Sequence, residues 1–429
     1  MPLALQPPAA SLKKRVLRLC LAALGVAYIR RTWTSLLQQR AMLRLQSAGA
    51  SVSTAALAAA TSGRPPRRSA NVLWRALRYT ILSQIIAASE FLLPLAKPLL
   101  AARIGRLLVW KGPRVQPNAV YGPHERNTVD VYGIDSESTS AAIASNDEQR
   151  KSIDSELSAR KPVLVFVHGG AWSFGHKWQY GLVGEFLSTT LGVLVAVVNY
   201  RTYPTGHVQD MVEDVELAID WVRKNCHAFG GDKEQIFLSG HSSGAHIGAL
   251  TLIQSAMRVA SPGLKQEASA SKTTGRRDEV VNVVKGFIGL AGPYDIVDHY
   301  VFESERAVGP FRGVHEISPM KPATLGVENF EAHSPTRLAA QSKLSKLPTF
   351  HVLHGVDDMT HAGQDAKFIG VKCCTHEDIL FAVMGDDVAC RARVVEHIER
   401  IMRSAVPRTQ EVKARTTGSR ELVRPMAKL

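Results

Sequence analysis

The chain has 429 residues, of which 45% are hydrophobic and 21% are charged. This composition is typical of a globular protein and excludes collagen-like, coiled-coil and wholly disordered chains. The formal net charge is +14, and residues 1–89 hold thirteen lysines and arginines but no acidic residue. The remaining 340 residues hold 39 basic and 38 acidic groups. The excess charge therefore belongs to the N-terminal segment, and we expect no nucleic-acid partner.

Residues 1–112 have the composition of a targeting or membrane-anchor region with a linker. An apolar run of 11 residues, 19–29, lies between clusters of lysine and arginine, and it is short for a span that needs about 20 residues. A second run, 79–102, is long enough to cross a bilayer but contains Glu90 and Lys97. We expect membrane association at the endoplasmic reticulum or Golgi, the alternative being a transit peptide for a mitochondrion or plastid.

Residues 113–405 alternate strand and helix patterns. Several strand candidates are continuous apolar runs, as expected for strands covered on both faces, and the clearest helix has Val208, Val215 and Ile219 on one face. We therefore predict an α/β fold, an α/β-hydrolase type of mostly parallel central sheet with helices on both faces. Residues 292–337 are expected to form a cap, and 406–429 a disordered basic tail. The predicted strands are 128–132, 163–168, 193–198, 235–239, 284–290, 349–353 and 371–374.

The five cysteines include no CxxC pair. They predict neither a disulfide framework nor a zinc site, and we expect no metal. The adjacent Cys373 and Cys374 are interpreted as small apolar residues of a short strand.

The strongest motif is Gly240-His241-Ser242-Ser243-Gly244, which follows an apolar strand and precedes an apolar helix. Glycines two residues either side of a serine allow a sharp strand-to-helix turn that exposes its Oγ above the sheet. The motif predicts that Ser242 is a nucleophile.

A second motif, His168-Gly169-Gly170-Ala171-Trp172, follows another apolar strand. Acyl transfer builds negative charge on a carbonyl oxygen, and a glycine-rich loop can direct backbone N–H groups at that charge. We expect the N–H groups of Gly169 and Gly170 to form an oxyanion hole with that of Ser243.

A nucleophilic serine needs a histidine to accept its proton. His376 fits, because it lies in a loop after the last predicted strand. Its rivals fit less well, since His397 belongs to a helical pattern and His361 is too close to the expected acid.

The acid that orients this histidine is expected directly after a strand. Asp358, after strand 349–353, is preferred to its neighbour Asp357. Asp295, after strand 284–290, is an alternative acid.

Together these motifs resemble the α/β-hydrolase superfamily, and within it the carboxylesterase branch that contains prenylcysteine methylesterases and kynurenine formamidases. The likeness to prenylcysteine methylesterases is strongest and covers about residues 120–403. It implies a triad of Ser242, Asp358 and His376, backbone oxyanion donors at Gly169, Gly170 and Ser243, and no metal or organic cofactor. The residues that carry the resemblance are 168–172, 200–201, 230–232, 240–246 and 375–376.

The chain departs from this family in one interval. Only 18 residues separate Asp358 from His376, where relatives place a full helix and a strand. We expect a reduced connection, with about two helical turns at 362–368 and a four-residue strand at 371–374 that returns His376 to the sheet.

The predicted function is that of a serine hydrolase acting on a carboxylic ester, with a lipophilic substrate such as a prenylcysteine methyl ester. The alternatives are an arylformamidase-type amide hydrolase and a catalytically impaired hydrolase fold that serves as a binding module. Aromatic residues of the cap either line an apolar substrate pocket or only pack the cap. They are Tyr294, Tyr300, Phe302, Phe311 and Phe330.

Overall fold

The computed structural model describes residues 115–134, 160–260, 279–305 and most of 307–404. The gaps in the last range are 309–310, 313–314, 316–317, 343, 345, 356–366, 373 and 386–387. Both apolar runs of the N-terminal region, and the predicted C-terminal tail, lie outside the described residues.

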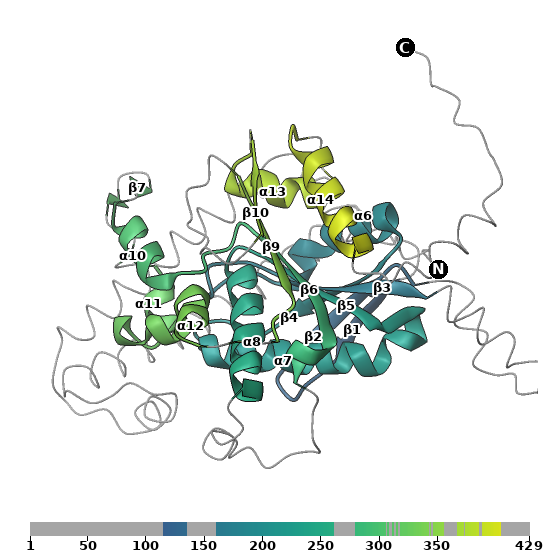
Figure 1. The fold of residues 1–429 in the computed structure, drawn as a ribbon, viewed down its shortest axis with the longest axis horizontal. Helices are drawn as coiled ribbons and strands as arrows, with labels where there is room; N and C mark the ends of the chain where they lie inside the picture. The colour runs from purple at the N-terminus through teal and green to yellow at the C-terminus, as the bar shows by residue number, and fades with distance from the viewer. Residues whose placement is uncertain are drawn as a thin grey trace, which may run out of the picture.

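Within these residues, eight strands form one sheet in the order β1-β2-β4-β3-β5-β6-β9-β10 (Figure 1). The pairs β1–β2 and β2–β4 are antiparallel, and all pairs from β4 to β10 are parallel. The predicted mostly parallel sheet is therefore confirmed. The strands are β1 (Val115–Val120), β2 (Thr128–Tyr132), β3 (Lys161–Val167), β4 (Leu194–Asn199), β5 (Gly231–His241), β6 (Val284–Leu290), β9 (Thr349–Gly355) and β10 (Lys367–Val371).

Helices cover both faces of the sheet, because side chains of a strand alternate between faces. In β3, Val163, Val165 and Val167 pack in one core cluster with helices α7 and α8. Leu164 and Phe166 point into the other cluster, with α6, α13 and α14. Figure 1 shows these helices on opposite sides of the sheet. Their bounds are α6 (Gly181–Leu191), α7 (Val208–Asn225), α8 (Ser243–Ala260), α13 (His376–Val383) and α14 (Arg391–Ser404).

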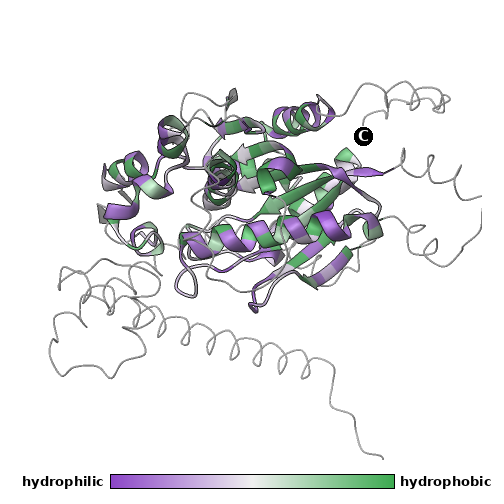
Figure 2. Ribbon diagram, turned by 60° about the horizontal axis from the view of Figure 1, so that its bottom comes forward, coloured by the Kyte–Doolittle hydropathy of each residue, from purple (hydrophilic) through white to green (hydrophobic). Residues whose placement is uncertain are grey.

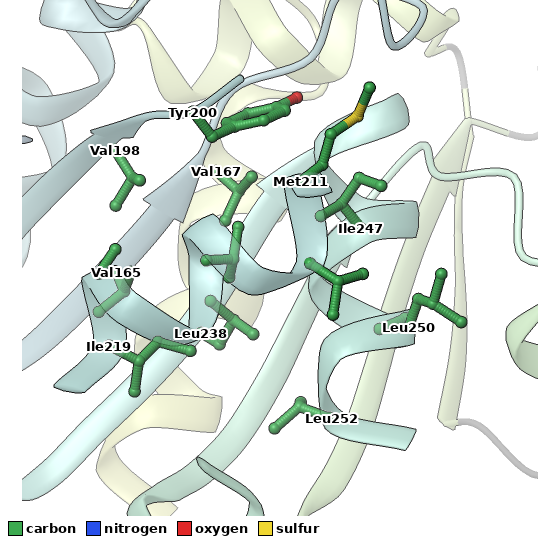
Figure 3. Close-up of a cluster of buried hydrophobic side chains, with 14 of the residues drawn as sticks. Val165, Val167, Val198, Tyr200, Met211, Ile219, Leu238, Ile247, Leu250 and Leu252 are labelled. Atoms are coloured by element: carbon green, nitrogen blue, oxygen red, sulfur yellow. The ribbon is translucent and has the colours of Figure 1, made fainter. Parts of the chain in front are cut away.

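The two core clusters fix the centre of the sheet. Figure 2 shows mostly hydrophobic central strands and helices banded with hydrophilic residues. In Figure 3, Val165 and Leu238 of the sheet lie among Met211 of α7 and Ile247 of α8, and all four are fully buried. Burying such a side chain contributes about 1.5–3 kcal/mol. The packing holds α8, which follows Ser242, firmly against the sheet.

Two strand predictions have the observed bounds, 128–132 and 284–290, and four others overlap the observed strands. The strand predicted at 371–374 was wrong, because β10 spans Lys367–Val371 and pairs in parallel with β9. For the same reason the helix predicted at 362–368 is wrong at its last two residues, and its other residues lie outside the described ones.

Sequence analysis also missed β1. This edge strand is mostly exposed, contains Pro117, and is irregular between Gln116 and Ala119, with Asn118 at a positive φ of 55°. Proline and a bulge belong at sheet edges, and neither gives the alternation that marks a strand.

The expected cap, residues 292–337, falls between β6 and β9, where short elements lie beside the sheet (Figure 1). Arg337 joins its ends, since its guanidinium forms ion pairs with Asp295 and Asp298. The elements are α10 (Ile296–Glu305), β7 (Ala307–Val308), β8 (Phe311–Arg312), α11 (Met320–Ala323), the 3-10 turns η6 (Val327–Asn329) and η7 (Glu331–His333), and α12 (Pro335–Gln341).

Candidate active site

The carboxyl ends of β3, β5, β6, β9 and β10 meet at one edge of the sheet, because these strands are parallel. In open α/β sheets this edge is where ligands bind. Ser242 follows β5, the glycine-rich loop follows β3, and His376 comes after β10. The fold thus brings the loops that carry these three predictions to the same edge.

Ser242 occupies a strained turn between β5 and α8. Its φ of 54° lies in the left-handed region, which is uncommon for residues other than glycine and clusters at functional sites. Its N–H donates to the Leu290 carbonyl at 2.8 Å, which ties the turn to β6. Ser242 is half-buried, whereas Ser239 and Ser243 are buried. Of the three serines, Ser242 is the one that a substrate can reach.

The two glycines of the motif are required by close backbone packing. A Cβ on Gly244 would lie 2.3 Å from the Val167 carbonyl oxygen and 2.4 Å from that of His168. A Cβ on Gly240 would lie 2.6 Å from the backbone of Gly244. The glycines therefore allow α8 to start directly against the end of β3, which places Ser242 beside the loop that follows β3.

That loop, residues 168–175, turns sharply. The N–H groups of Ser173 and Phe174 both donate to the Gly170 carbonyl, at 3.0 and 2.7 Å. Gly170 has a φ of 137°, and Ala171 and Trp172 adopt left-handed values of 46° and 56°. Strained residues that the surrounding packing holds in place are a property of functional loops.

Two buried histidines brace this loop. The His168 ring stacks on Tyr200 with 4.4 Å between centroids, and the Tyr200 hydroxyl donates to the His168 carbonyl at 2.7 Å. Trp172 Nε1 donates to His246 Nδ1 at 2.9 Å, so His246 Nε2 carries the hydrogen and donates to the His333 carbonyl at 2.7 Å. Burial lowers the pKa of each histidine to about 3. Both rings are therefore neutral and structural.

The predicted oxyanion donor Gly169 has a partner that the sequence did not indicate. Its N–H donates to the hydroxyl of Tyr180 at 3.0 Å. Tyr180 ends the 3-10 turn η2 (Lys177–Tyr180), ten residues beyond Gly170. The contact joins two loops in space, and no spacing rule predicts it.

The base candidate His376 is the first residue of α13 and is partly buried. Thr375 caps the helix, since its Oγ1 accepts from the Asp378 N–H at 3.2 Å while Asp378 accepts from the Thr375 N–H at 3.1 Å. The His376 ring lies 5.0 Å from the ring of His241, centroid to centroid. Because His241 precedes Ser242, this contact places His376 next to the nucleophile turn.

The acid candidates Asp357 and Asp358, like His361, lie outside the described residues. The last described residue before them is Gly355, which ends β9. A Cβ there would lie 1.9 Å from the Cys374 carbonyl oxygen, so the two backbones touch. Asp358 comes three residues after Gly355, and Cys374 comes two residues before His376. The contact therefore lies close in sequence to both candidates.

With this geometry in place, comparison with known proteins is informative. The BD-FAE family model matches residues 153–362, a range that ends before His376. The esterase of Pyrobaculum calidifontis has a TM-score of 0.50 at 17% identity, over 76% of this chain and 92% of that one. Esterase B from Lactobacillus rhamnosis has a TM-score of 0.52 at 13% identity, over 78% and 99% of the two chains. These structures share the fold.

Sequence relatives are more specific. The isoprenylcysteine alpha-carbonyl methylesterase of Arabidopsis thaliana is 34% identical over 261 residues, 59% of this chain and 51% of that protein. A "Probable isoprenylcysteine alpha-carbonyl methylesterase" of Oryza sativa subsp. japonica is 32% identical over 248 residues, 56% of this chain and 48% of that protein. The chain has the α/β-hydrolase fold and resembles the prenylcysteine methylesterases. It spans about half the length of these curated relatives.

The alternative acid Asp295 has structural partners. Its carboxylate accepts from Arg337 Nε at 2.8 and 3.0 Å, and from the Val297 N–H at the start of α10 at 3.0 Å. The alternative base His397 lies on α14, where its Nδ1 accepts from Arg400 at 2.5 Å. These contacts make Asp295 a cap residue and His397 a helix-surface residue.

The aromatic residues of the expected cap divide into two groups. Tyr294 and Phe330 are buried in a core cluster, and Tyr300 packs on Phe330 with 5.0 Å between centroids. Phe302 is 37% exposed, and the side chain of Phe311 lies outside the described residues. Of the two interpretations, packing holds for Tyr294 and Phe330.

The described part of the chain has two further properties. Its helices include none that is both long enough and apolar enough to span a bilayer. In the same residues no three His, Cys, Asp or Glu side chains are grouped as metal ligands would be.

Proposed function

We propose that this chain is a serine hydrolase that cleaves carboxylic esters through an acyl-enzyme. The observation that carries the proposal is the strained turn at Ser242, which lies between the glycine-rich loop and the helix that begins with His376. A half-buried serine that a substrate can reach at such a turn, with a histidine and backbone donors nearby, is the arrangement that nucleophilic acyl transfer requires. The esterase names of the sequence relatives support the same reaction.

In the proposed mechanism Ser242 Oγ attacks the ester carbonyl while His376 accepts the hydroxyl proton. Backbone N–H groups of Gly170 and Ser243 stabilise the tetrahedral oxyanion, together with the donor pair that the Gly169 N–H forms with the Tyr180 hydroxyl. His376 then returns the proton to the leaving alcohol, and water repeats the sequence to release the acid. The cycle uses side chains and backbone of the protein and needs no cofactor.

The proposed acid is Asp358. The contact between Gly355 and the Cys374 carbonyl supports it, since it brings the chain before Asp358 against the chain before His376. The pairing of β10 with β9 also returns the chain to this edge within the short interval. Asp357 stays the alternative within this loop, while the ion pair with Arg337 makes Asp295 the weaker choice.

The proposed substrate is a lipophilic ester, with a prenylcysteine methyl ester as the specific candidate. The names of the plant relatives support this choice. Purified protein should hydrolyse a farnesylcysteine methyl ester faster than formylkynurenine. The reverse order of kcat/KM would instead favour an arylformamidase.

We also propose that the N-terminal region holds the protein on a membrane, at the endoplasmic reticulum or Golgi. Its positive charge and its two apolar runs support this. The full chain should sediment with membranes at low and at high salt. Recovery in the supernatant under both conditions would contradict the anchor and favour a cleaved transit peptide.

A fluorophosphonate probe tests the nucleophile directly, because an activated serine attacks its phosphorus as it would a carbonyl. The wild-type chain should be labelled, Ser242→Ala should not, and Ser239→Ala should be labelled like wild type. Ser239 is a matched control, since its hydroxyl donates to the Ile288 carbonyl at 2.7 Å inside the sheet. An unlabelled wild type would favour the catalytically impaired binding module.

A further inference from the structure

The hydroxyl of Tyr180 lies at the predicted oxyanion hole. Tyr180 is only 3% exposed, and its ring packs near Phe166 and His168 of β3 and its loop, at centroid distances of 5.8 and 5.9 Å. The side chain therefore has one position, set by the core, and its oxygen is held at the end of β3. A donor fixed in this way stabilises charge without reorganising.

Two partners surround the Tyr180 hydroxyl. The Gly169 N–H can only donate, so Tyr180 Oη accepts this bond at 3.0 Å. The hydroxyl hydrogen is then available for His241 Nδ1, which lies 3.3 Å from Oη. His241 Nε2 lies 3.4 Å from the His376 carbonyl oxygen, an acceptor, so Nε2 carries the hydrogen and Nδ1 accepts. The chain of bonds thus runs from Gly169 through Tyr180 and His241 to His376.

The Gly169 peptide lies between Tyr180 and the nucleophile. A Cβ built on Gly169 would be 3.0 Å from Tyr180 Oη and 3.1 Å from Ser242 Cβ. The phenol oxygen and Ser242 therefore flank the same small space. Because the Gly169 N–H already bonds the phenol, the hydrogen that this pair can offer to a substrate is the phenolic one.

We propose that the Tyr180 hydroxyl is a donor of the oxyanion hole and turns from His241 Nδ1 to the carbonyl oxygen of an ester bound at Ser242. The Gly169 N–H polarises the phenol and strengthens this hydrogen bond. No proton is transferred, since the phenol donates a hydrogen bond to the oxyanion and stays protonated. The assignment rests on the proposed function, because it needs Ser242 to be the nucleophile.

Burial keeps the phenol in its donating form. It raises the pKa of Tyr180 above its ordinary value, although the Gly169 N–H opposes the shift. The hydroxyl is therefore protonated throughout the working range of the enzyme. The Tyr180 hydroxyl donates to His241 Nδ1 when the site is empty and to the substrate oxygen when an ester is bound. The buried hydroxyl therefore has an acceptor in both states, which avoids the penalty for an unpaired polar group.

In a competing arrangement, the Tyr180 hydroxyl only accepts the Gly169 N–H until a substrate binds. In that case the Gly169 N–H would leave the phenol and bond the substrate oxygen itself, as the family pattern implies. The two arrangements predict opposite results for Tyr180→Phe, which removes the hydroxyl and releases the Gly169 N–H.

The experiment compares Tyr180→Phe with Tyr200→Phe on a short-chain p-nitrophenyl ester. Tyr200 is the matched control, because its buried hydroxyl bonds the His168 carbonyl of the same loop. We expect Tyr180→Phe to lose about 100-fold or more in kcat, with KM changed only a few-fold, as for loss of one oxyanion donor. Tyr200→Phe should lose stability in thermal unfolding but keep most of its kcat.

A second readout follows the oxyanion itself. An aliphatic trifluoromethyl ketone forms a hemiketal on a catalytic serine, and its ionisation can be followed by ¹⁹F NMR. Tyr180→Phe should raise the hemiketal pKa and weaken inhibition about as much as it lowers kcat. If that variant does not fold, 2,3-difluorotyrosine at position 180 keeps the shape and donates more strongly, so the hemiketal pKa should fall.

The outcomes separate the two proposals. If wild type is active and labelled at Ser242 while Tyr180→Phe keeps its kcat and inhibitor affinity within about threefold, Tyr180 is not a donor and the proposed function stands. An unchanged hemiketal pKa in the fluorinated protein overturns the assignment as well. If wild type neither cleaves esters nor is labelled, the proposed function fails and this assignment fails with it.

Discussion

The two halves of the candidate site are built differently. The nucleophile half, from β3 and β5 to α8, lies at the centre of the sheet and is held by backbone contacts at Gly240 and Gly244. The base half, from β9 and β10 to α13, lies at the edge of the sheet. It is held by the parallel pairing of β10 with β9 and of β9 with β6, by a capped helix and by the contact of Gly355 with Cys374.

This difference determines where the chain tolerates substitution. A turn packed against backbone atoms has no room to adjust, so its sequence is dictated by sterics. An edge strand and a short helix need only to position the His376 imidazole beside Ser242. The short interval between Asp358 and His376 lies in the half with the weaker constraints, and substitutions in the two halves should therefore differ in kind.

The largest effect is expected from His376→Ala in the base half. Without the base, Ser242 is not activated, and kcat for ester hydrolysis should fall by about 10³-fold or more, with little change in stability. His397→Ala is the control on the neighbouring helix α14 and should keep full turnover. Unchanged turnover in His376→Ala would show that another group is the base.

Gly244→Ala should damage folding, since its Cβ would meet the carbonyl oxygens of Val167 and His168. We expect it to lower the free energy of unfolding by about 3 kcal/mol or more. Gly248→Ala, one turn along the same helix, would meet side-chain atoms of Phe287 and Leu238 at 3.0 Å or beyond. It should change stability by less than about 1 kcal/mol, and equal effects of both variants in urea unfolding would contradict the steric account.

The buried histidines of the nucleophile half should make stability depend on pH. Burial lowers the pKa of His246 from 6.5 to about 3, so the unfolded chain binds a proton between these values and the folded one does not. Stability is therefore full above about pH 6.5 and falls as the pH drops towards 3, by about 1 kcal/mol per pH unit for this histidine.

The test is His246→Gln, because glutamine can accept from Trp172 and donate to the His333 carbonyl but does not titrate. Urea unfolding at pH 7 and pH 5 should show a shallower loss of stability in the variant. His168 remains in both proteins and supplies the residual slope. Equal slopes would mean that His246 is not buried as a neutral ring.

The smallest effect is expected at the helix cap of the base half. Thr375→Ala removes the side-chain oxygen that accepts from the Asp378 N–H, a loss of about 1 kcal/mol. Because α13 starts at His376, kcat should fall a few-fold while KM changes little. Thr375→Ser should restore both stability and kcat. If it does not restore kcat, the cap does not position His376.

The central half could be predicted well from the sequence, since its apolar runs and glycines carry local signals. The bounds of β6 and the turn at Ser242 are examples. The edge half could be predicted less well. Three of the four residues 371–374 are apolar, as in a strand, but pairing with His351–Gly355 selects residues 367–371 instead, and pairing is a tertiary property.

The contact between Tyr180 and His241 also could not be predicted from the sequence. Their hydroxyl and imidazole meet only because η2 and β5 pack together at the end of β3. A tyrosine ten residues after Gly170 has no pattern of its own. Contacts of this kind come from packing and not from spacing.

We propose that the two halves meet in one catalytic triad despite the short interval. A crystal structure of the protein would give the separations of His376 from Ser242 and from Asp358. We expect one imidazole nitrogen about 2.6–3.2 Å from Ser242 Oγ and the other at the same distance from the Asp358 carboxylate. An imidazole turned away from Ser242, or an Asp358 carboxylate bonded elsewhere, would contradict it.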